Sequence, residues 1–325
     1  MHMYRRLAAG TRHFNHMTMN NEKIFIVGSG AIGRALAVFL TLNNRQVVML
    51  RGSVDEGESY RSQVRVELMN QESLEATFQT STLGSFSELD GLIVLTNKSY
   101  GNKRLSSLLK GKIKDAPLVI LQNGLGVEQP FAEEGFPEIY RCVLFATSQI
   151  TSAHTLSFKP VAESPIGVIR GGGAKLQAVV AQLSSKYFQF RLESDIQPII
   201  WEKTIINCVF NSICPLLDVD NGIFYRNKDA LNIAKRVIGE CVEIAKGNAI
   251  KLDPDEILAK LLLISRSSEG QLISTLQDIK NGRETEIDTL NFEIVQAAAK
   301  IGKEELVKDT LLLGELTKLK AKIFN

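Results

Sequence analysis

The feature that most constrains the fold is a glycine-rich run between two apolar segments. Residues 23–27 form a short β-branched stretch, residues 31–42 have the apolar content of a buried helix, and the run that joins them reads Gly28-Ser29-Gly30-Ala31-Ile32-Gly33. In a strand-to-helix turn of this kind, the first glycine permits the tight turn, the second lets the backbone approach a pyrophosphate, and the third allows close packing. The helix N-terminus then presents free N–H groups to the phosphates. We therefore predict a dinucleotide site, with a glycine-rich turn that binds nothing as the alternative.

The segments that follow alternate between strand-like and helix-like patterns as far as about residue 190. Apolar strand patterns cover residues 46–50, 91–95 and 117–121, and a helical pattern lies between the last two at 100–109. This alternation predicts an α/β fold with a doubly wound parallel sheet, the Rossmann arrangement. The triple glycine at 171–173 is expected to form a loop between two strands at the far edge of that sheet.

Helical patterns replace the strands in the second half of the chain. They cover residues 198–213, 228–248, 253–265, 269–279 and 284–301, and Pro254 behind Asp253 has the spacing of a capped helix start. We predict an extension at 1–22, a Rossmann domain at 23–192 and an all-helical domain at 193–325, with the junction near residues 191–197. Residues 1–21 contain three arginines and no acidic residue. We favour an unstructured segment or an upstream start codon, and an organelle transit peptide is the alternative.

Charge and cysteine content exclude several classes of protein. The chain has 325 residues and a formal charge of +2 from 38 basic and 36 acidic side chains, so a nucleic-acid or membrane partner is not expected. No apolar run approaches the roughly 20 residues of a membrane helix. The four cysteines form no CxxC pair and no cluster with histidine, which predicts no metal site. They indicate buried, reduced thiols in a cytoplasmic protein.

Arg51 stands where the second strand ends, at the position that selects between nicotinamide cofactors. NAD sites place a carboxylate there for the ribose 2′-hydroxyl, whereas a guanidinium suits a 2′-phosphate. The sequence therefore predicts NADPH as the cofactor. An exposed arginine without a ligand is the alternative.

Lys203, Asn207 and Asn211 are spaced four residues apart in an otherwise apolar helical segment, so they share one face. One ammonium and two carboxamides are poor core residues unless they face a polar cleft. Reduction of a ketone needs a proton for the developing alkoxide, which a lysine can supply. An exposed lysine with two packing asparagines is the alternative, and it would be preferred if this segment stood alone.

The order of four motifs resembles the ketopantoate reductase family from about residue 23 to about residue 300. The motifs begin with the glycine run and continue with Leu121-Gln-Asn123-Gly124-Leu-Gly126, Trp201-Glu-Lys203-Thr-Ile-Ile-Asn207-Cys-Val-Phe-Asn211 and Ser274-Thr-Leu-Gln-Asp278-Ile-Lys-Asn-Gly-Arg-Glu-Thr-Glu286-Ile-Asp288. The resemblance implies a Rossmann domain, a helical domain and an active site between them. It also implies the NADPH-dependent reduction of 2-dehydropantoate to pantoate, a step of coenzyme A biosynthesis.

The resemblance assigns roles on the substrate side. It implies that Lys203 is the catalytic general acid and that Glu286 is a catalytic carboxylate that holds this lysine and the ligand hydroxyls. It further implies that Asn207, Asn211 and Ser274 bind the substrate. Read by itself, Glu286 would be an exposed helix residue.

Further roles concern the cofactor. Asn123 matches an asparagine near both the nicotinamide and the substrate, and Lys98 falls at a cofactor-contact position, although it is otherwise an ordinary strand-end lysine. The expected cofactor contacts are Gly28, Ser29, Gly30, Ala31, Ile32, Gly33, Arg51, Lys98, Asn123 and Glu286.

Two departures from the family pattern leave the substrate open. Residues 300–305 lack the usual proline, and residues 146–167 lack the usual histidine-containing strand start. A related dehydrogenase for another small 2-keto acid and a non-catalytic nucleotide sensor are the alternatives. A hydroxyacid or glycerol-phosphate dehydrogenase is a lesser one, because the asparagine pair beside the lysine fits it less well. The joint presence of Lys203 and Glu286 favours an enzyme. A homodimer is one assembly that the sequence allows.

Overall fold

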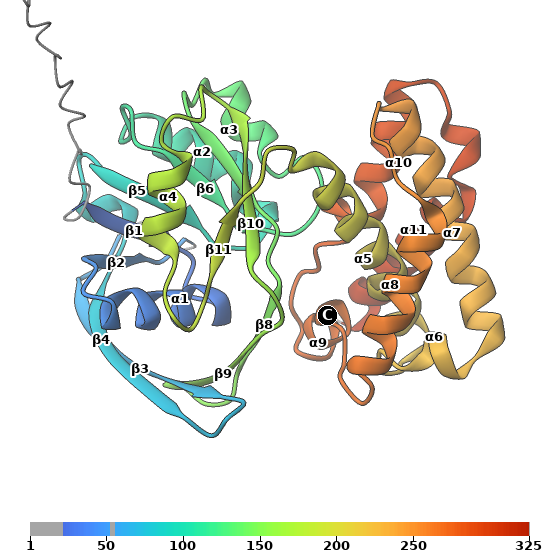
Figure 1. Cartoon of the computed structure of the whole chain (residues 1–325), viewed down its shortest axis with the longest axis horizontal. Helices are drawn as coiled ribbons and strands as arrows, with labels where there is room; N and C mark the ends of the chain where they lie inside the picture. The colour runs from blue at the N-terminus through green and yellow to red at the C-terminus, as the bar shows by residue number, and fades with distance from the viewer. Residues whose placement is uncertain (1–21, 53–55, 325) are drawn as a thin grey trace, which may run out of the picture.

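The computed structural model describes residues 22–52 and 56–324, which form a sheet with flanking helices followed by a helical part (Figure 1). The predicted extension, except for residue 22, lies outside the described residues. Glu22 precedes the first strand, and β11 ends at Leu192 shortly before α5 begins at Gln197. The domain limits at 192 and 193 stay a prediction.

One sheet contains the described strands of the first part, in the order β11-β10-β7-β6-β5-β1-β2-β4-β3-β9-β8. From β7 to β4, each strand pairs in parallel with its neighbour, as the alternation of strands and helices predicts. In chain order the strands are β1 (Lys23–Val27), β2 (Val47–Leu50), β3 (Tyr60–Leu68), β4 (Ser73–Ser81), β5 (Gly91–Leu95), β6 (Leu118–Ile120), β7 (Ile139–Cys142), β8 (Ala146–Ile150), β9 (Thr155–Pro160), β10 (Ser164–Arg170) and β11 (Phe190–Leu192).

Helices cover both faces of this sheet, because its central strands are apolar on both sides. In β1, Ile24 and Ile26 pack with α1 (Ala31–Leu42) and α4 (Leu176–Leu183). The intervening Phe25 and Val27 pack on the opposite side with α2 (Asn102–Lys110) and α3 (Gln129–Glu133). The doubly wound arrangement is thereby confirmed. Short 3-10 turns η1 (Leu83–Ser85) and η2 (Ser99–Gly101) complete this part.

The second part is built around α5 (Gln197–Leu217), which contacts α7, α9 and α11. Most of the α5 side chains are buried, and Pro198 stands in its first turn, where the missing N–H costs no hydrogen bond. The other described elements are α6 (Ile223–Arg226), α7 (Lys228–Gly247), α8 (Pro254–Ser267), α9 (Ser274–Lys280), η3 (Ile287–Thr289), α10 (Asn291–Lys300), η4 (Glu304–Leu306) and α11 (Lys308–Phe324).

Three expectations about the elements are wrong. The helix predicted at 269–279 begins only at Ser274, and the one predicted at 284–301 begins at Asn291 after a loop and a 3-10 turn. The loop at 171–173 joins a strand to α4 rather than two strands, because the apolar spacing after it is helical. The start of α8 is as predicted, since the Asp253 side chain accepts a hydrogen bond from the Asp255 N–H.

The cysteine prediction is confirmed, since the four cysteines are free and buried at Cys142, Cys208, Cys214 and Cys241. Within residues 22–52 and 56–324, no group of histidine, cysteine or acidic side chains could hold a metal ion. The same residues contain no helix that is both long and apolar enough to cross a membrane.

Candidate active site

The glycine run forms the turn between β1 and α1, and each glycine has a different environment. Gly28 adopts a φ of +112°, and a Cβ there would lie 2.4 Å from the backbone nitrogen of Asn97. A Cβ on Gly33 would lie 2.2 Å from the Gly28 carbonyl oxygen, whereas one on Gly30 would meet nothing within 4 Å. The outer glycines therefore allow close packing, and the space beside Gly30 is open. No side chain caps the N-terminus of α1, which leaves its first N–H groups to face this space.

Arg51 directly follows β2, and its side chain contacts Glu58 and Tyr60. Its Nη2 donates to the Glu58 carbonyl oxygen at 3.4 Å, and its guanidinium lies 5.5 Å from the centre of the Tyr60 ring. Its Nε is buried without a hydrogen-bond partner among the described residues. These contacts fix a positive charge beside the carboxyl end of β2, next to the glycine run.

A network of amides fixes the carboxyl ends of β5 and β6, which lie beside β1 in the sheet. The Gln122 amide nitrogen donates to the Asn97 carbonyl oxygen at 2.9 Å and to the Asn102 side chain at 2.8 Å. Asn102 donates in return to Gln122 and to the Val127 carbonyl oxygen. Because the carboxyl ends of parallel strands share one edge, this network holds Lys98 and Asn123 at the same edge as the glycine run.

Arg141, in β7, is a buried arginine beneath the loop that carries Asn123. It is 1% exposed, forms an ion pair with Glu128, and donates from Nη2 to the carbonyl oxygens of Gln122 and Gly124 at 3.3 and 2.9 Å. These carbonyls flank Asn123. The buried guanidinium therefore supports the backbone on both sides of a predicted site residue.

Lys203 comes from α5 and reaches toward the same loop. It is half-buried, and its Nζ donates to the Leu144 carbonyl oxygen at 2.6 Å. Burial lowers the pKa of Lys203 to about 8, and the Arg141 charge acts in the same direction, while Cys142 and more weakly Glu286 oppose the shift. A small cavity with room for about one water molecule is lined by Gln122, Asn123, Gly124, Arg141, Cys142, Val143, Ile200, Lys203 and Thr204.

Asn211, two turns beyond Lys203, joins α5 to the start of α9. Its side-chain oxygen accepts hydrogen bonds from the Ser274 hydroxyl at 3.1 Å and from the Thr275 N–H at 3.2 Å. The structure therefore brings together two of the residues predicted to bind the substrate. Asn207 lies half-buried between Lys203 and Asn211 on α5.

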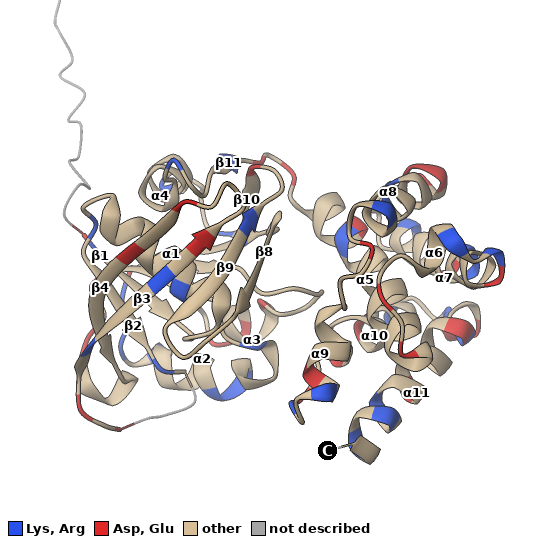
Figure 2. Ribbon diagram, turned by 90° about the horizontal axis from the view of Figure 1, so that it is seen from below, with Lys and Arg blue, Asp and Glu red and all other residues tan. Residues whose placement is uncertain are grey.

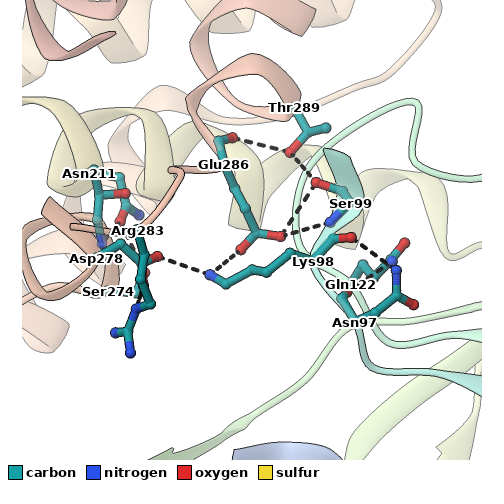
Figure 3. A network of polar contacts seen from close by, with 11 residues as sticks. Asn97, Lys98, Ser99, Gln122, Asn211, Ser274, Asp278, Arg283, Glu286 and Thr289 are labelled. Atoms are coloured by element: carbon teal, nitrogen blue, oxygen red, sulfur yellow. Dashed lines mark hydrogen bonds and ion pairs between the residues drawn. The ribbon is translucent and has the colours of Figure 1, made fainter. Parts of the chain in front are cut away.

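Glu286 lies in the loop before η3 and pairs with Lys98 (Figure 3). The Lys98 Nζ is 2.9 Å from Glu286 Oε2 and 3.0 Å from Asp278 Oδ2, and the second Glu286 oxygen accepts from the Ser99 hydroxyl at 3.3 Å. Burial lowers the pKa of Lys98, but the two carboxylates outweigh this effect and raise it overall. The ion pairs connect the sheet edge to α9 and the loop before η3.

The structure does not show the expected contact between Glu286 and Lys203. The carboxylate forms its ion pair with Lys98, and the Lys203 ammonium is instead bound by the Leu144 carbonyl. Two residues around this site, Asp278 and Arg141, were not predicted from the sequence. Asp278 belongs to the motif that begins at Ser274, and its position four residues after Ser274 on α9 is the signal that could have marked it. No pattern in the sequence marks Arg141, because it occupies a strand whose other residues are apolar.

Comparison with known proteins identifies the family of this chain. The model described as "Ketopantoate reductase PanE/ApbA" matches residues 24–166, and its C-terminal counterpart matches residues 195–312. A 2-dehydropantoate 2-reductase of Pyrococcus horikoshii is 30% identical over 315 residues, which cover 92% of this chain and 97% of the relative. The chain belongs to the ketopantoate reductase family. A probable 2-dehydropantoate 2-reductase of Schizosaccharomyces pombe is 26% identical over 333 residues, covering 90% of this chain and 95% of its own.

Solved structures share the fold of this ketopantoate reductase family member. A PanE/ApbA family ketopantoate reductase from Ralstonia eutropha superposes with a TM-score of 0.80 at 20% identity, covering 93% of this chain and 99% of its own. A D-mandelate dehydrogenase in complex with NADH and anilino(oxo)acetate superposes with a TM-score of 0.79 at 22% identity and the same coverage. The Rossmann sheet with a helical second part, predicted from the sequence, is therefore the fold of its structural relatives.

Proposed function

We propose that this protein is an NADPH-dependent 2-dehydropantoate 2-reductase, which reduces ketopantoate to pantoate in pantothenate and coenzyme A biosynthesis. Two relatives that this chain matches over nearly their whole lengths are named for this activity. The observation that carries the proposal is the placement of the Lys203 ammonium and Asn123 on one small cavity at the carboxyl edge of the sheet. This edge is where α/β folds bind their ligands.

Lys203 is the proposed proton donor. With a pKa of about 8, the side chain is about nine-tenths protonated at pH 7, yet it gives up its proton far more readily than an ordinary lysine. A donor whose pKa lies near the working pH is well suited to general acid catalysis. The ammonium would protonate the substrate oxygen as negative charge develops there, and in a cleft poor in water this donor counts for more than it would in bulk solvent.

Several polar groups around Lys203 suit an anionic 2-keto acid. The Arg141 charge is neutralised by Glu128, whereas the ammonium of Lys203 is bound by a carbonyl oxygen, so a substrate carboxylate would supply its counter-charge. The oxygen of Asn211 already accepts two hydrogen bonds, so a substrate oxygen would meet its N–H donors. Asn207 and Ser274 would bind alongside it.

The residues of the glycine run and Arg51 together suit NADPH. The open space at Gly30 and the uncapped start of α1 suit a pyrophosphate, and the fixed charge of Arg51 suits a 2′-phosphate. When bound, NADPH supplies the hydride for the keto carbon. Lys98 would hold the Glu286 carboxylate at the mouth of the site, where the carboxylate can accept a hydrogen bond from a ligand hydroxyl.

The decisive experiment is an absorbance assay of NADPH oxidation against a panel of 2-keto acids. The panel contains ketopantoate, 2-ketoisovalerate, pyruvate and phenylglyoxylate, and NADH is tested in parallel. We expect the highest kcat/KM with ketopantoate and NADPH. A higher kcat/KM with another keto acid would overturn the substrate assignment, and tight NADPH binding without turnover of any keto acid would favour a nucleotide sensor.

A further inference from the structure

Arg141 is a buried charge in a strand where an apolar side chain would serve the fold as well. It stands in β7 between Tyr140 and Cys142, which are both buried, and it is itself only 1% exposed. Its charge is paired with Glu128, at the start of α3. A buried ion pair of this kind contributes little net stability compared with well-packed apolar residues. The buried arginine is therefore better explained by the groups that it binds than by the stability of β7.

The guanidinium of Arg141 holds the loop that carries Asn123. Its Nη2 donates to the carbonyl oxygens of Gln122 at 3.3 Å and of Gly124 at 2.9 Å. These carbonyls belong to the residues immediately before and after Asn123. Because both are bound by one rigid, planar group, the backbone from which the Asn123 side chain projects is fixed on either side.

The helical part binds the same loop, where it lies beside the sheet part (Figure 2). The Leu125 N–H donates to the Thr289 carbonyl oxygen of η3 at 2.9 Å. Gly124 has a φ of +96°, and a Cβ there would lie 2.3 Å from that same oxygen. The Thr289 hydroxyl in turn donates to the Glu286 carbonyl oxygen. The loop is thus bound both by Arg141 of the sheet part and by η3 of the helical part, which leaves it little freedom to shift.

The position of this loop matters for the reaction of the proposed function. Asn123, Arg141 and Lys203 line one small cavity, so Asn123 lies close to the proposed proton donor. Hydride transfer requires the nicotinamide, the keto carbon and the proton donor to be aligned, and a misplacement of about 1 Å can slow such a reaction roughly a hundredfold. A residue that fixes Asn123 therefore acts on the reaction without entering it.

We propose that Arg141 is a positioning residue of the reductase, which aligns Asn123 with the cofactor, the keto acid and Lys203 by fixing the backbone on both sides of Asn123. The proposal rests on the proposed function, because it assigns Asn123 to the reacting groups. It concerns the two bonds to the loop carbonyls rather than the ion pair with Glu128.

The test replaces both partners of the ion pair, Arg141→Met together with Glu128→Gln. Loss of Arg141 alone would leave an unpaired, largely buried carboxylate and could prevent folding. The matched control is Arg170→Met on β10, because Arg170 also donates to a backbone carbonyl oxygen, that of Ala132 in α3 rather than in the loop. Rates are compared at pH 7. The Arg141 charge lowers the pKa of Lys203, so its removal leaves Lys203 protonated at this pH.

Turnover and cofactor binding should separate in the paired variant. We expect kcat with the best keto acid to fall by roughly tenfold to a hundredfold. The NADPH Kd from fluorescence titration should change by less than about threefold, because the phosphates bind at the glycine run. Arg170→Met should match the wild type in both measurements. A kcat within about threefold of the wild type in a folded paired variant would overturn the positioning role.

A double-mutant cycle with Asn123→Ala tests whether Arg141 acts through Asn123. Once the Asn123 side chain is gone, the added loss of Arg141 and Glu128 should slow kcat by less than about threefold further, since nothing remains to be positioned. Effects that simply multiply would refute the action through Asn123.

Hydrogen exchange of the protein without cofactor tests the loop itself. Amides of residues 121–127 should exchange faster in the paired variant than in the wild type, while those of β1 keep their wild-type rates. Unchanged exchange in the loop, or equal acceleration in β1, would contradict the proposal. This measurement uses neither NADPH nor a keto acid, so it distinguishes a failure of the positioning role from a failure of the proposed function, which would appear as no turnover of any keto acid.

Discussion

Replacement of Lys203 by methionine isolates the contribution of its proton, because methionine retains an unbranched apolar stem of similar length. If Lys203 is the general acid, turnover of the best 2-keto acid should fall by roughly two to four orders of magnitude. This loss corresponds to about 3–5 kcal/mol in the activation free energy. NADPH affinity should change little, since the glycine run lies on the other part of the molecule. Fluorescence titration of the cofactor checks this point.

The same substitution should stabilise the fold. The pKa of Lys203 falls from 10.5 to about 8 because the side chain is buried, a difference worth about 3 kcal/mol. Because this pKa is lower in the folded than in the unfolded state, the full cost applies below about pH 8 and disappears as the pH rises to about 10.5. Methionine removes this cost but also the hydrogen bond from the charged ammonium to the Leu144 carbonyl oxygen, worth about 2 kcal/mol. We expect a net gain of about 1 kcal/mol in the free energy of unfolding at pH 7.

Two measurements check this reasoning. The wild-type rate of keto acid reduction should fall as the pH rises through about 8, while oxidation of the hydroxy acid should rise over the same range. Lys203→Arg keeps the charge but titrates far above this range, so its profile should lack the fall near pH 8. Urea denaturation at about pH 7 and pH 10 should show the methionine variant gaining stability only at the lower pH. Turnover within about threefold of wild type, under 1 kcal/mol, would refute the catalytic assignment.

Other expected outcomes concern the cofactor, the ion pairs at the mouth of the site and a helix cap. Arg51→Ala should raise the KM for NADPH and leave that for NADH nearly unchanged, and equal efficiency of the wild type with both cofactors would contradict the proposal. Lys98→Met leaves Asp278 and Glu286 without their shared cation, so thermal unfolding should show a loss of about 1–3 kcal/mol, and an unchanged melting temperature would argue against the bridge. Asp253→Ala removes the cap of α8 and should cost about 1 kcal/mol in urea denaturation, with Asp253→Asn as the control that retains the cap.

The parts of the fold that repeat a local pattern could be predicted from the sequence. The central strands are apolar on both faces, and the glycine run is typical of one structure, the turn between a strand and a helix. The sequence therefore predicts both the strands and the turn. The β3–β4 hairpin was not predicted, because much of its surface is exposed and only alternate positions such as Val64, Val66, Ala76 and Phe78 are buried. The alternation of buried and exposed positions with a period of two is the signal in the sequence that marks this hairpin.

The contacts of the candidate site could be predicted only where they follow one helix. Lys203, Asn207 and Asn211 share a face of α5 because their spacing fixes it. The pairing of Glu286 with Lys98 joins residues 188 positions apart, and no local pattern records such a contact. The same ion pair explains the wrong helix prediction. Glu286 is held in a loop by Lys98 and Ser99, so α10 begins only at Asn291.

The apolar core of the helical part contains two residues from the sheet part. Leu125, in the loop after β6, and Val143, just after β7, pack among the side chains of α5 and its neighbours. A C-terminal fragment that begins at residue 193 would lack both side chains. Their absence would leave a cavity beneath α5 and expose buried apolar residues to water. We therefore expect the two parts to fold together, although the sequence pattern changes near residue 193. The two parts should melt in one cooperative transition, and neither should be obtained as a stable domain by limited proteolysis.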